Sequence, residues 1–271
     1  MHSRRIRPGI RWGVLALGAL LLLTGCGFFR GRPDLLPPAG KLLEEGERDL
    51  AKGRYEGARE SLAKIVERHP ESDLVPTARF LIAESYYRAE EYERAARELD
   101  GFMTMYPGHA IADLAQYRLA RSYFDAMPGL ERDQGVAVKA LAEFQRLLKQ
   151  YPESRYAPDA IAKIEASRLR LAQKELWVAD YYVRQGNVAA ALQRYEGILK
   201  DYGRTAVAPQ VLFQKADALI RLGRPDDAAS ALQKLVDDYP ASEWSRRARE
   251  RQVQLNATTV QPATQPASLK Q

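Results

Sequence analysis

Apolar residues recur at helical spacing along most of the chain, and the longest uninterrupted run covers residues 158–185. No glycine or proline breaks this run before Gly186, and Pro158 is tolerated because the first N–H groups of a helix have no partner within it. At 1.5 Å per residue, the pattern predicts a helix roughly 40 Å long, compared with about 11–12 residues for an average helix. A second predicted helix, Val188 to Tyr202, folds back against it. The apolar positions of the long helix are Ile161, Ile164, Leu169, Ala172, Leu176, Ala179 and Tyr182.

Shorter helix pairs on both sides repeat one pattern of small and large apolar residues. A small residue at a fixed position lets two helices approach closely, and a proline or glycine ends the second helix of each pair. This pattern resembles the tetratricopeptide repeat and predicts an all-α, right-handed α-solenoid of about five helix pairs. The fixed alanines are Ala58, Ala95, Ala140, Ala191 and Ala228. The predicted units cover residues 41–72, 76–109, 111–154, 158–205 and 209–242, with a capping helix at 243–255.

Two insertions interrupt the regular spacing of these alanines, which lie 37, 45, 51 and 37 residues apart. Eight extra residues in the third unit, around Met127 to Gly135, are rich in proline and glycine and predict an exposed loop. Fourteen extra residues in the fourth unit lie inside the long helix. Since fourteen residues are nearly four turns, its packing face is almost kept.

The N-terminus carries the pattern of an exported lipoprotein. Basic residues precede a 12-residue apolar run, too short to span a bilayer, which ends in Leu23-Thr24-Gly25-Cys26. This tetrapeptide resembles the bacterial lipobox, so residues 1–25 are interpreted as a signal peptide and Cys26 as the site of a covalent diacylglyceryl and N-acyl anchor. An ordinary signal peptide with an incidental cysteine is the alternative. Gly27 favours the outer membrane by analogy, and residues 26–40 are predicted to be a flexible tether.

Charge and composition exclude several classes of function. The net charge of +6 includes four arginines before residue 26, and without them 37 basic and 35 acidic residues leave +2, which gives no case for a nucleic-acid partner. Histidines 2, 69 and 109 and the single cysteine offer no zinc-ligand pair. No phosphate-binding loop or nucleophile elbow is present, so we expect neither an enzyme nor a cofactor besides the lipid on Cys26.

Two features remain as candidate binding surfaces. The register places six residues on the groove-facing side of the first helices of units 2 and 3, where aromatic rings and charged heads suit an extended peptide. The alternative is that these rings pack between helices. The last helix carries four arginines, either as a solvated cap or as a surface for anionic groups, and residues 256–271 are predicted to be a disordered tail. The six groove candidates are Phe80, Glu84, Tyr87, Tyr117, Arg121 and Phe124.

Lipobox, tether, repeats and both insertions together resemble the BamD family of lipoproteins of the outer-membrane β-barrel assembly (BAM) machinery. The most specific stretch comprises Tyr151 to Ala160, Leu171-Ala172, Glu175, Val178 to Tyr182, Arg184, Gly186, Val188 to Ala190, Arg194 and Asp201-Tyr202. Gly203 departs from the family, which usually has proline there.

The resemblance implies a non-enzymatic scaffold on the periplasmic face of the outer membrane. Its C-terminal repeats would dock onto a POTRA domain of the barrel insertase BamA, with Arg194 and Arg184 as charged contacts. Its N-terminal repeats would engage unfolded outer-membrane proteins, and other BAM lipoproteins would be partners. The alternative is an adaptor for another envelope machine, such as a pilotin-like factor for a secretin or a coordinator of peptidoglycan or Tol-Pal function.

Overall fold

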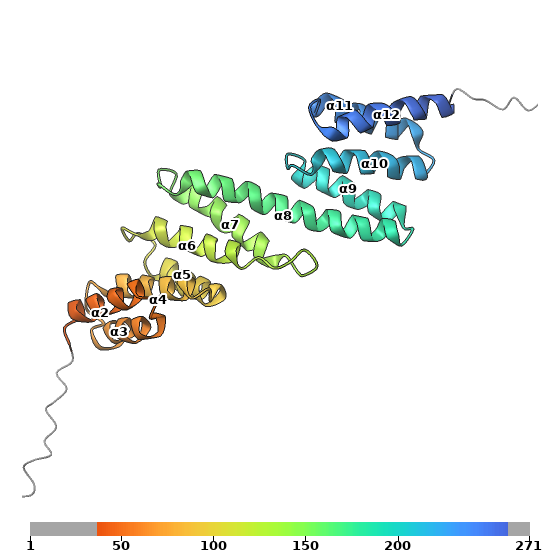
Figure 1. Ribbon diagram of the computed structural model, residues 1–271. Coiled ribbons are helices and arrows are strands. Elements are labelled where there is room, and N and C mark those ends of the chain that lie inside the picture. Colours follow the sequence, from red (N-terminus) through yellow and green to blue (C-terminus); the bar gives the residue numbers. More distant parts are fainter. Residues whose placement is uncertain (1–36, 260–271) are drawn as a thin grey trace, which may run out of the picture.

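The computed structural model describes residues 37–259, which form eleven α-helices and no β-strand (Figure 1). The predicted signal peptide, Cys26 and most of the predicted tether lie outside the described residues, as do residues 260–271. The helices are α2 (Ala39–Ala51), α3 (Tyr55–Arg68), α4 (Val75–Arg88), α5 (Tyr92–Met105), α6 (Ala112–Asp125), α7 (Gly135–Gln150), α8 (Ala157–Arg184), α9 (Val188–Tyr202), α10 (Ala208–Arg221), α11 (Pro225–Asp238) and α12 (Glu243–Thr259).

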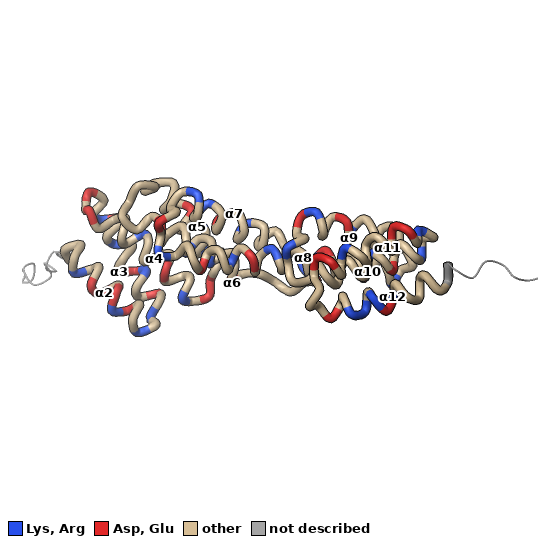
Figure 2. Tube along the Cα trace, turned by 90° about the horizontal axis from the view of Figure 1, so that it is seen from above, with Lys and Arg blue, Asp and Glu red and all other residues tan. Residues whose placement is uncertain are grey.

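Each helix packs against the next one along the chain, so the helices form five antiparallel pairs followed by α12. The first helices of successive units also touch, at α2–α4, α4–α6 and α6–α8. Figure 2 shows the same array from above as one elongated row, with acidic and basic residues interspersed along it. The prediction of an all-α solenoid of about five helix pairs is confirmed.

Small residues set the distance between the two helices of a pair. The five repeat alanines are fully buried, at Ala58, Ala95, Ala140, Ala191 and Ala228. In the first pair, Gly46 of α2 faces Leu62 of α3 so closely that a Cβ atom at Gly46 would lie 2.6 Å from the Leu62 Cγ atom. Such a contact is closer than packed carbon atoms allow, so the glycine is required for this approach.

Helix α8 belongs to two different hydrophobic cores. Its first turns place Ala160 and Ile164 in a core with α6 and α7, and its last turns place Ala172, Leu176 and Ala179 in a core with α9 to α12. At 28 residues it is about 42 Å long. Figure 1 shows it running from the N-terminal group of helices to the C-terminal group. Because the fourteen inserted residues fall about 40° short of four turns, the C-terminal group is rotated about α8 relative to the regular repeat.

The predicted packing face of α8 is wrong at Ile161, and Leu169 is only partly buried and belongs to neither core. Ile161 is 55% exposed and belongs to neither core, whereas Ala160, one residue earlier, is fully buried. One residue corresponds to about 100° around a helix, so the buried stripe follows Ala160 and Ile164 and leaves Ile161 outside.

The inserted loop between α6 and α7 is held against α8 rather than fully exposed. Arg170 of α8 donates hydrogen bonds to the carbonyl oxygen of Pro128 and, at 3.3 Å, to Oε1 of Gln134. Lys174 Nζ donates to the Leu130 carbonyl at 2.8 Å, and the Gln134 side chain is buried. The two insertions that the sequence shows separately are therefore in contact, and the loop connects the third unit to the middle of α8.

The C-terminal end of the array also differs from the prediction. Helix α12 continues to Thr259, four residues beyond the predicted capping helix and into the segment predicted to be disordered. Residues 256–259 contain no proline or glycine, so nothing in their sequence ends the helix at Leu255.

We expect the double substitution Arg170→Ala and Lys174→Ala to release the loop while the helices stay folded. Each charged hydrogen bond contributes about 1.5–3 kcal/mol when buried and less when partly exposed, so amide exchange in residues 127–134 should accelerate at least roughly tenfold. Hydrogen exchange with mass spectrometry measures this. Arg168→Ala on the exposed side of α8 is the control, and equal loop exchange in both variants would contradict the contact.

Candidate partner-binding surfaces

The aromatic groove candidates of α4 and α6 lie mainly inside the helix array. Phe80 is buried and packs edge-on against Phe102 of α5, with ring centroids 6.2 Å apart. Tyr117 is buried and stacks on Tyr156, with centroids 4.6 Å apart and planes 14° from parallel. For these two rings the prediction of a peptide-lining role is wrong and the alternative, packing between helices, is correct. Large aromatic side chains suit both a peptide-binding groove and the space between packed helices, so repeat register alone does not distinguish these two locations.

Glu84 is likewise an interior residue, since it is only 5% exposed. Its Oε2 atom lies 2.9 Å from Nε of Arg118 on α6, and its Oε1 atom lies 2.9 Å from Nε of Arg88, one turn further along α4. Two guanidinium groups therefore neutralise one buried carboxylate, as burial of a charge requires. The carboxylate that was expected to contact a peptide backbone instead joins α4 to α6.

The remaining polar candidates form a ladder of hydrogen bonds across three units. Tyr87 of α4 donates to Oδ2 of Asp125 at 2.5 Å, and Arg121 forms an ion pair with the same atom at 3.1 Å. Arg121 also donates to the Tyr117 hydroxyl at 3.1 Å, and that hydroxyl donates to Asp159 of α8 at 2.8 Å. Burial, together with the hydrogen bond to Asp125, raises the pKa of Tyr87 to about 12. The ladder fixes α4, α6 and α8 side by side.

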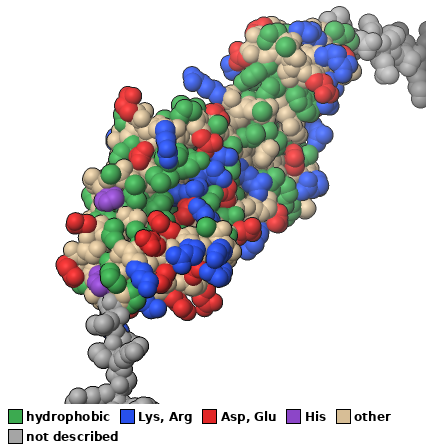
Figure 3. Space-filling model, turned by 60° about the vertical axis from the view of Figure 1, so that its left-hand side comes forward, with side chains coloured by type: hydrophobic (Ala, Val, Ile, Leu, Met, Phe, Trp, Pro, Cys, Tyr) green, Lys and Arg blue, Asp and Glu red, His purple; other side chains and the backbone are tan. Residues whose placement is uncertain are grey.

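Several side chains of this region still reach the surface. Phe124 is partly buried against Phe144, and Lys163 of α8 lies over its ring at 4.6 Å. Arg88 is exposed, and Tyr87 and Arg121 are partly exposed. Figure 3 shows Lys and Arg side chains gathered in the middle of one face beside hydrophobic ones. Arginine and lysine side chains and the edges of aromatic rings are therefore the groups that α4, α6 and the start of α8 present to solvent here.

Arg194 and Arg184 lie in the C-terminal group. Arg194 of α9 is 44% exposed, and its Nη1 atom donates to Oε2 of Glu175 on α8 at 2.9 Å. The hydrogen bond that Arg194 donates to Glu175 raises the pKa of Arg194, so the guanidinium remains charged. Arg184 is exposed in the last turn of α8. Glu175 holds Arg194 in place and leaves it accessible.

Sequence reasoning did not select an exposed aromatic pair on α8. Trp177 and Tyr181 are both exposed although they are large and apolar. They are four residues apart and so share one face of the helix, with the Lys174 ammonium 4.7 Å from the Trp177 ring. Their spacing is visible in the sequence, but the same spacing is typical of buried positions.

The four arginines of α12 have different roles. Arg247 lies over the rings of Phe213 and Trp244, at 4.8 and 4.3 Å, and Arg251 pairs with Asp217 of α10 at 3.0 Å. These two side chains attach α12 to α10. Arg246 and Arg249 are exposed, in keeping with a solvated cap.

Within residues 37–259, no helix is long and apolar enough to cross a membrane, and no three metal-ligating side chains come together. The eleven helices of the described residues form a repeat array of the tetratricopeptide type.

Comparison with known proteins specifies the family. The sequence profile of the YfiO family, described as outer membrane lipoprotein, matches residues 37–231, and the chain belongs to this family.

Two relatives of similar length are both named outer membrane protein assembly factor BamD. The chain is 29% identical to the outer membrane protein assembly factor BamD of Rickettsia prowazekii over 224 residues, which cover 83% of this chain and 89% of the relative. It is 26% identical to BamD of Caulobacter vibrioides over 263 residues, covering 96% and 85% respectively.

Solved structures of tetratricopeptide proteins are more distant. The TPR2AB-domain:pHSP90 complex of yeast Sti1 is 18% identical with a TM-score of 0.43 and coverage of 82% and 84%. The P58(IPK) TPR domain is 16% identical with a TM-score of 0.40 and coverage of 83% and 67%.

We expect Glu84→Leu to destabilise the N-terminal group by about 3 kcal/mol, because Arg118 then loses its buried carboxylate. Urea unfolding followed by circular dichroism measures this. The double variant Glu84→Leu with Arg118→Leu should recover part of the loss, since the less exposed of the two unpaired charges is removed and Arg88 reaches solvent. Asp238→Ala, which removes an exposed pair with Lys234, is the control and should cost less than about 1 kcal/mol. Equal effects of the two single variants would contradict the interior role of Glu84.

Proposed function

We propose that this chain is a lipoprotein subunit of the BAM complex that binds a BamA-like insertase and helps to recruit and insert unfolded outer-membrane β-barrel proteins. The observation that carries this proposal is the match with assembly factors named BamD over nearly the whole of both chains. The family description, outer membrane lipoprotein, agrees with the lipobox at Cys26.

The fold suits a scaffold rather than a catalyst. The described residues contribute helix faces, ion pairs and packed rings, and their polar side chains mostly satisfy one another. A rigid array presents several separated surfaces, so partners can bind simultaneously without competing.

Helix α8 separates two such surfaces. In the C-terminal group, Arg194 is exposed and already oriented by Glu175, so little side-chain entropy is lost when it contacts an acidic residue of a POTRA domain. Arg184, exposed at the end of α8, is a second contact. In the N-terminal group, the cations and ring edges of α4 and α6 are the surface for unfolded barrel proteins or for other BAM lipoproteins.

The lipid on Cys26 places the scaffold on the periplasmic face of the outer membrane. Several acyl chains provide stable anchoring. A tether then keeps the repeats close to the insertase, which raises their effective concentration and makes several weak contacts sufficient.

The complex itself tests this function. Affinity purification of the full-length chain from detergent-solubilised membranes, followed by mass spectrometry, should recover a BamA-like barrel in near-equal amount. Recovery of a secretin or of peptidoglycan-synthesis proteins in its place would contradict the proposal and indicate an adaptor for another envelope machine.

We expect Arg194→Glu to weaken binding to the POTRA domains of the insertase about tenfold, which corresponds to about 1.4 kcal/mol. The substitution replaces an attraction with a repulsion at an exposed site, so the thermal unfolding curve should change little. Isothermal titration calorimetry gives the dissociation constant.

The matched control is Arg224→Glu, which reverses an arginine of similar exposure beside α11 that pairs with Asp227. Its dissociation constant should equal that of the unmodified chain. The proposed contact is wrong if Arg194→Glu binds as tightly as this control.

A further inference from the structure

The C-terminal group contains a cavity of about 240 Å³ between α8, α9, α10 and α12, separate from the surfaces described above. Its apolar walls come from Val183, Val188, Phe213 and Trp244. Pockets for drug-sized ligands are about 300–1,000 Å³, so this one is suited to a single long side chain.

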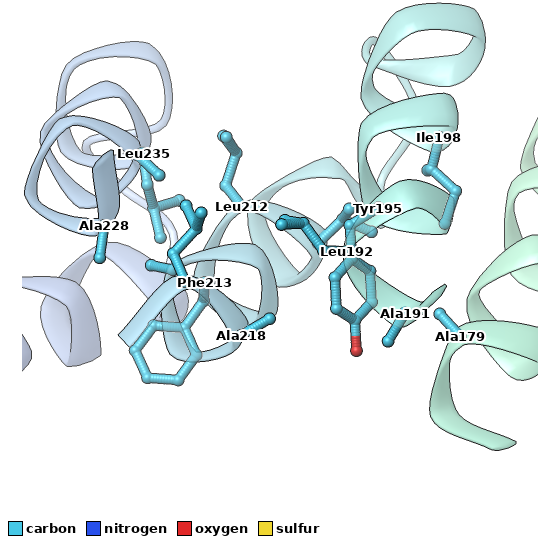
Figure 4. Close-up of a cluster of buried hydrophobic side chains, with 14 of the residues drawn as sticks. Ala179, Ala191, Leu192, Tyr195, Ile198, Leu212, Phe213, Ala218, Ala228 and Leu235 are labelled. Atoms are coloured by element: carbon cyan, nitrogen blue, oxygen red, sulfur yellow. The ribbon is translucent and has the colours of Figure 1, made fainter. Parts of the chain in front are cut away.

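One wall of the cavity carries a tyrosine hydroxyl group. Tyr195 of α9 is only 2% exposed as a residue, and its hydroxyl, which opens on the cavity, forms no hydrogen bond with any residue that the structure describes. Figure 4 shows this hydroxyl projecting out of the surrounding apolar cluster, on the side to which the Phe213 ring also points. The hydroxyl is therefore available to a group that enters the cavity.

Two carboxylates face the same space. Asp180 of α8 is partly buried and forms no ion pair with any described lysine or arginine; its hydrogen bond is with Gln214 Nε2, at 3.5 Å. Burial raises the pKa of Asp180, while the nearby charge of Arg184 and the hydrogen bond from Gln214 lower it. Asp217 of α10 uses Oδ1 to bind Arg251. After burial, both carboxylates contribute to raising the pKa of Tyr195 to about 12, so their negative potential is felt at the hydroxyl.

Two arginines complete the lining. Arg221 is exposed at the end of α10, and the guanidinium of Arg247 covers the rings of Phe213 and Trp244. Since these aromatic faces are already covered by a cation, the groups left for a second cation are Asp180, the Tyr195 hydroxyl and Asp217, whose Oδ1 atom already binds Arg251.

We propose that this cavity binds a lysine or arginine side chain presented by an extended peptide segment of a partner protein. The cation donates hydrogen bonds to Asp180 and the Tyr195 hydroxyl, and its aliphatic stem lies against Val183 and Val188. Arg221 and Arg247 favour acidic residues on either side of the basic one. The proposal does not depend on barrel assembly, because the cavity and its charges define the ligand.

The probe is the capped pentapeptide acetyl-Ala-Asp-Lys-Asp-Ala-amide, titrated into the full-length ¹⁵N-labelled chain in detergent. The indole N–H signal of Trp244, in the cavity wall, should shift and saturate, while that of Trp177 on the exposed face of α8 should not. A matched peptide with norleucine in place of lysine, which keeps the stem and removes the charge, should bind at least tenfold more weakly.

Two substitutions test the polar groups separately. Asp180→Asn should weaken lysine-peptide binding at least fivefold, and Tyr195→Phe, which removes only the hydroxyl, should weaken it about threefold. Asp201→Asn, an exposed carboxylate at the other end of α9 that does not line the cavity, should leave binding unchanged. Tyr195→Phe retains the buried ring, so it provides the test if Asp180→Asn fails to fold.

Three results would overturn the proposal. The first is the lack of a saturable Trp244 shift. The second is equal binding of the norleucine peptide, which would define an apolar pocket only. The third is tighter binding of a peptide with glutamate in place of lysine, which would assign the site to Arg221 and Arg247.

Discussion

The continuity of α8 is the constraint on which the rest of this structure depends. One helix supplies Ala160 and Ile164 to the core of the N-terminal group and Ala172, Leu176 and Ala179 to the core of the C-terminal group. The segment between these two sets lacks a complete helix pair of its own, and the loop between α6 and α7 supports it through Arg170 and Lys174. A shorter helix would lose this connection between the two groups.

Much of the fold follows from local sequence patterns. The repeat alanines are fully buried because a helix pair in this fold tolerates only small side chains at its closest approach, so five of them at regular spacing predict five pairs. The length of α8 follows from the lack of helix-breaking residues between Pro158 and Gly186. These features depend on residues that are near one another in sequence.

The surface was harder to predict because it depends on contacts between units. Repeat register predicted Tyr117 in the groove, whereas its ring is buried and stacks on Tyr156, which depends on how α8 is positioned beside α6. Proline and glycine predicted a turn after Met127, but the hydrogen bonds of that turn come from side chains about forty residues later. The ladder from Tyr87 to Asp159 likewise joins three units that local patterns describe separately.

The length of α8 also determines the angle by which the C-terminal group of helices is rotated relative to the N-terminal group. Because a helix turns by about 100° per residue, inserting or deleting a few residues between Ile164 and Ala172 would rotate Arg194 about the axis of α8 relative to α4 and α6, while leaving both surfaces chemically unchanged. A change in helix length alone can therefore reorient one of the two proposed binding surfaces relative to the other during evolution. Such a change needs no substitution among the residues of either surface.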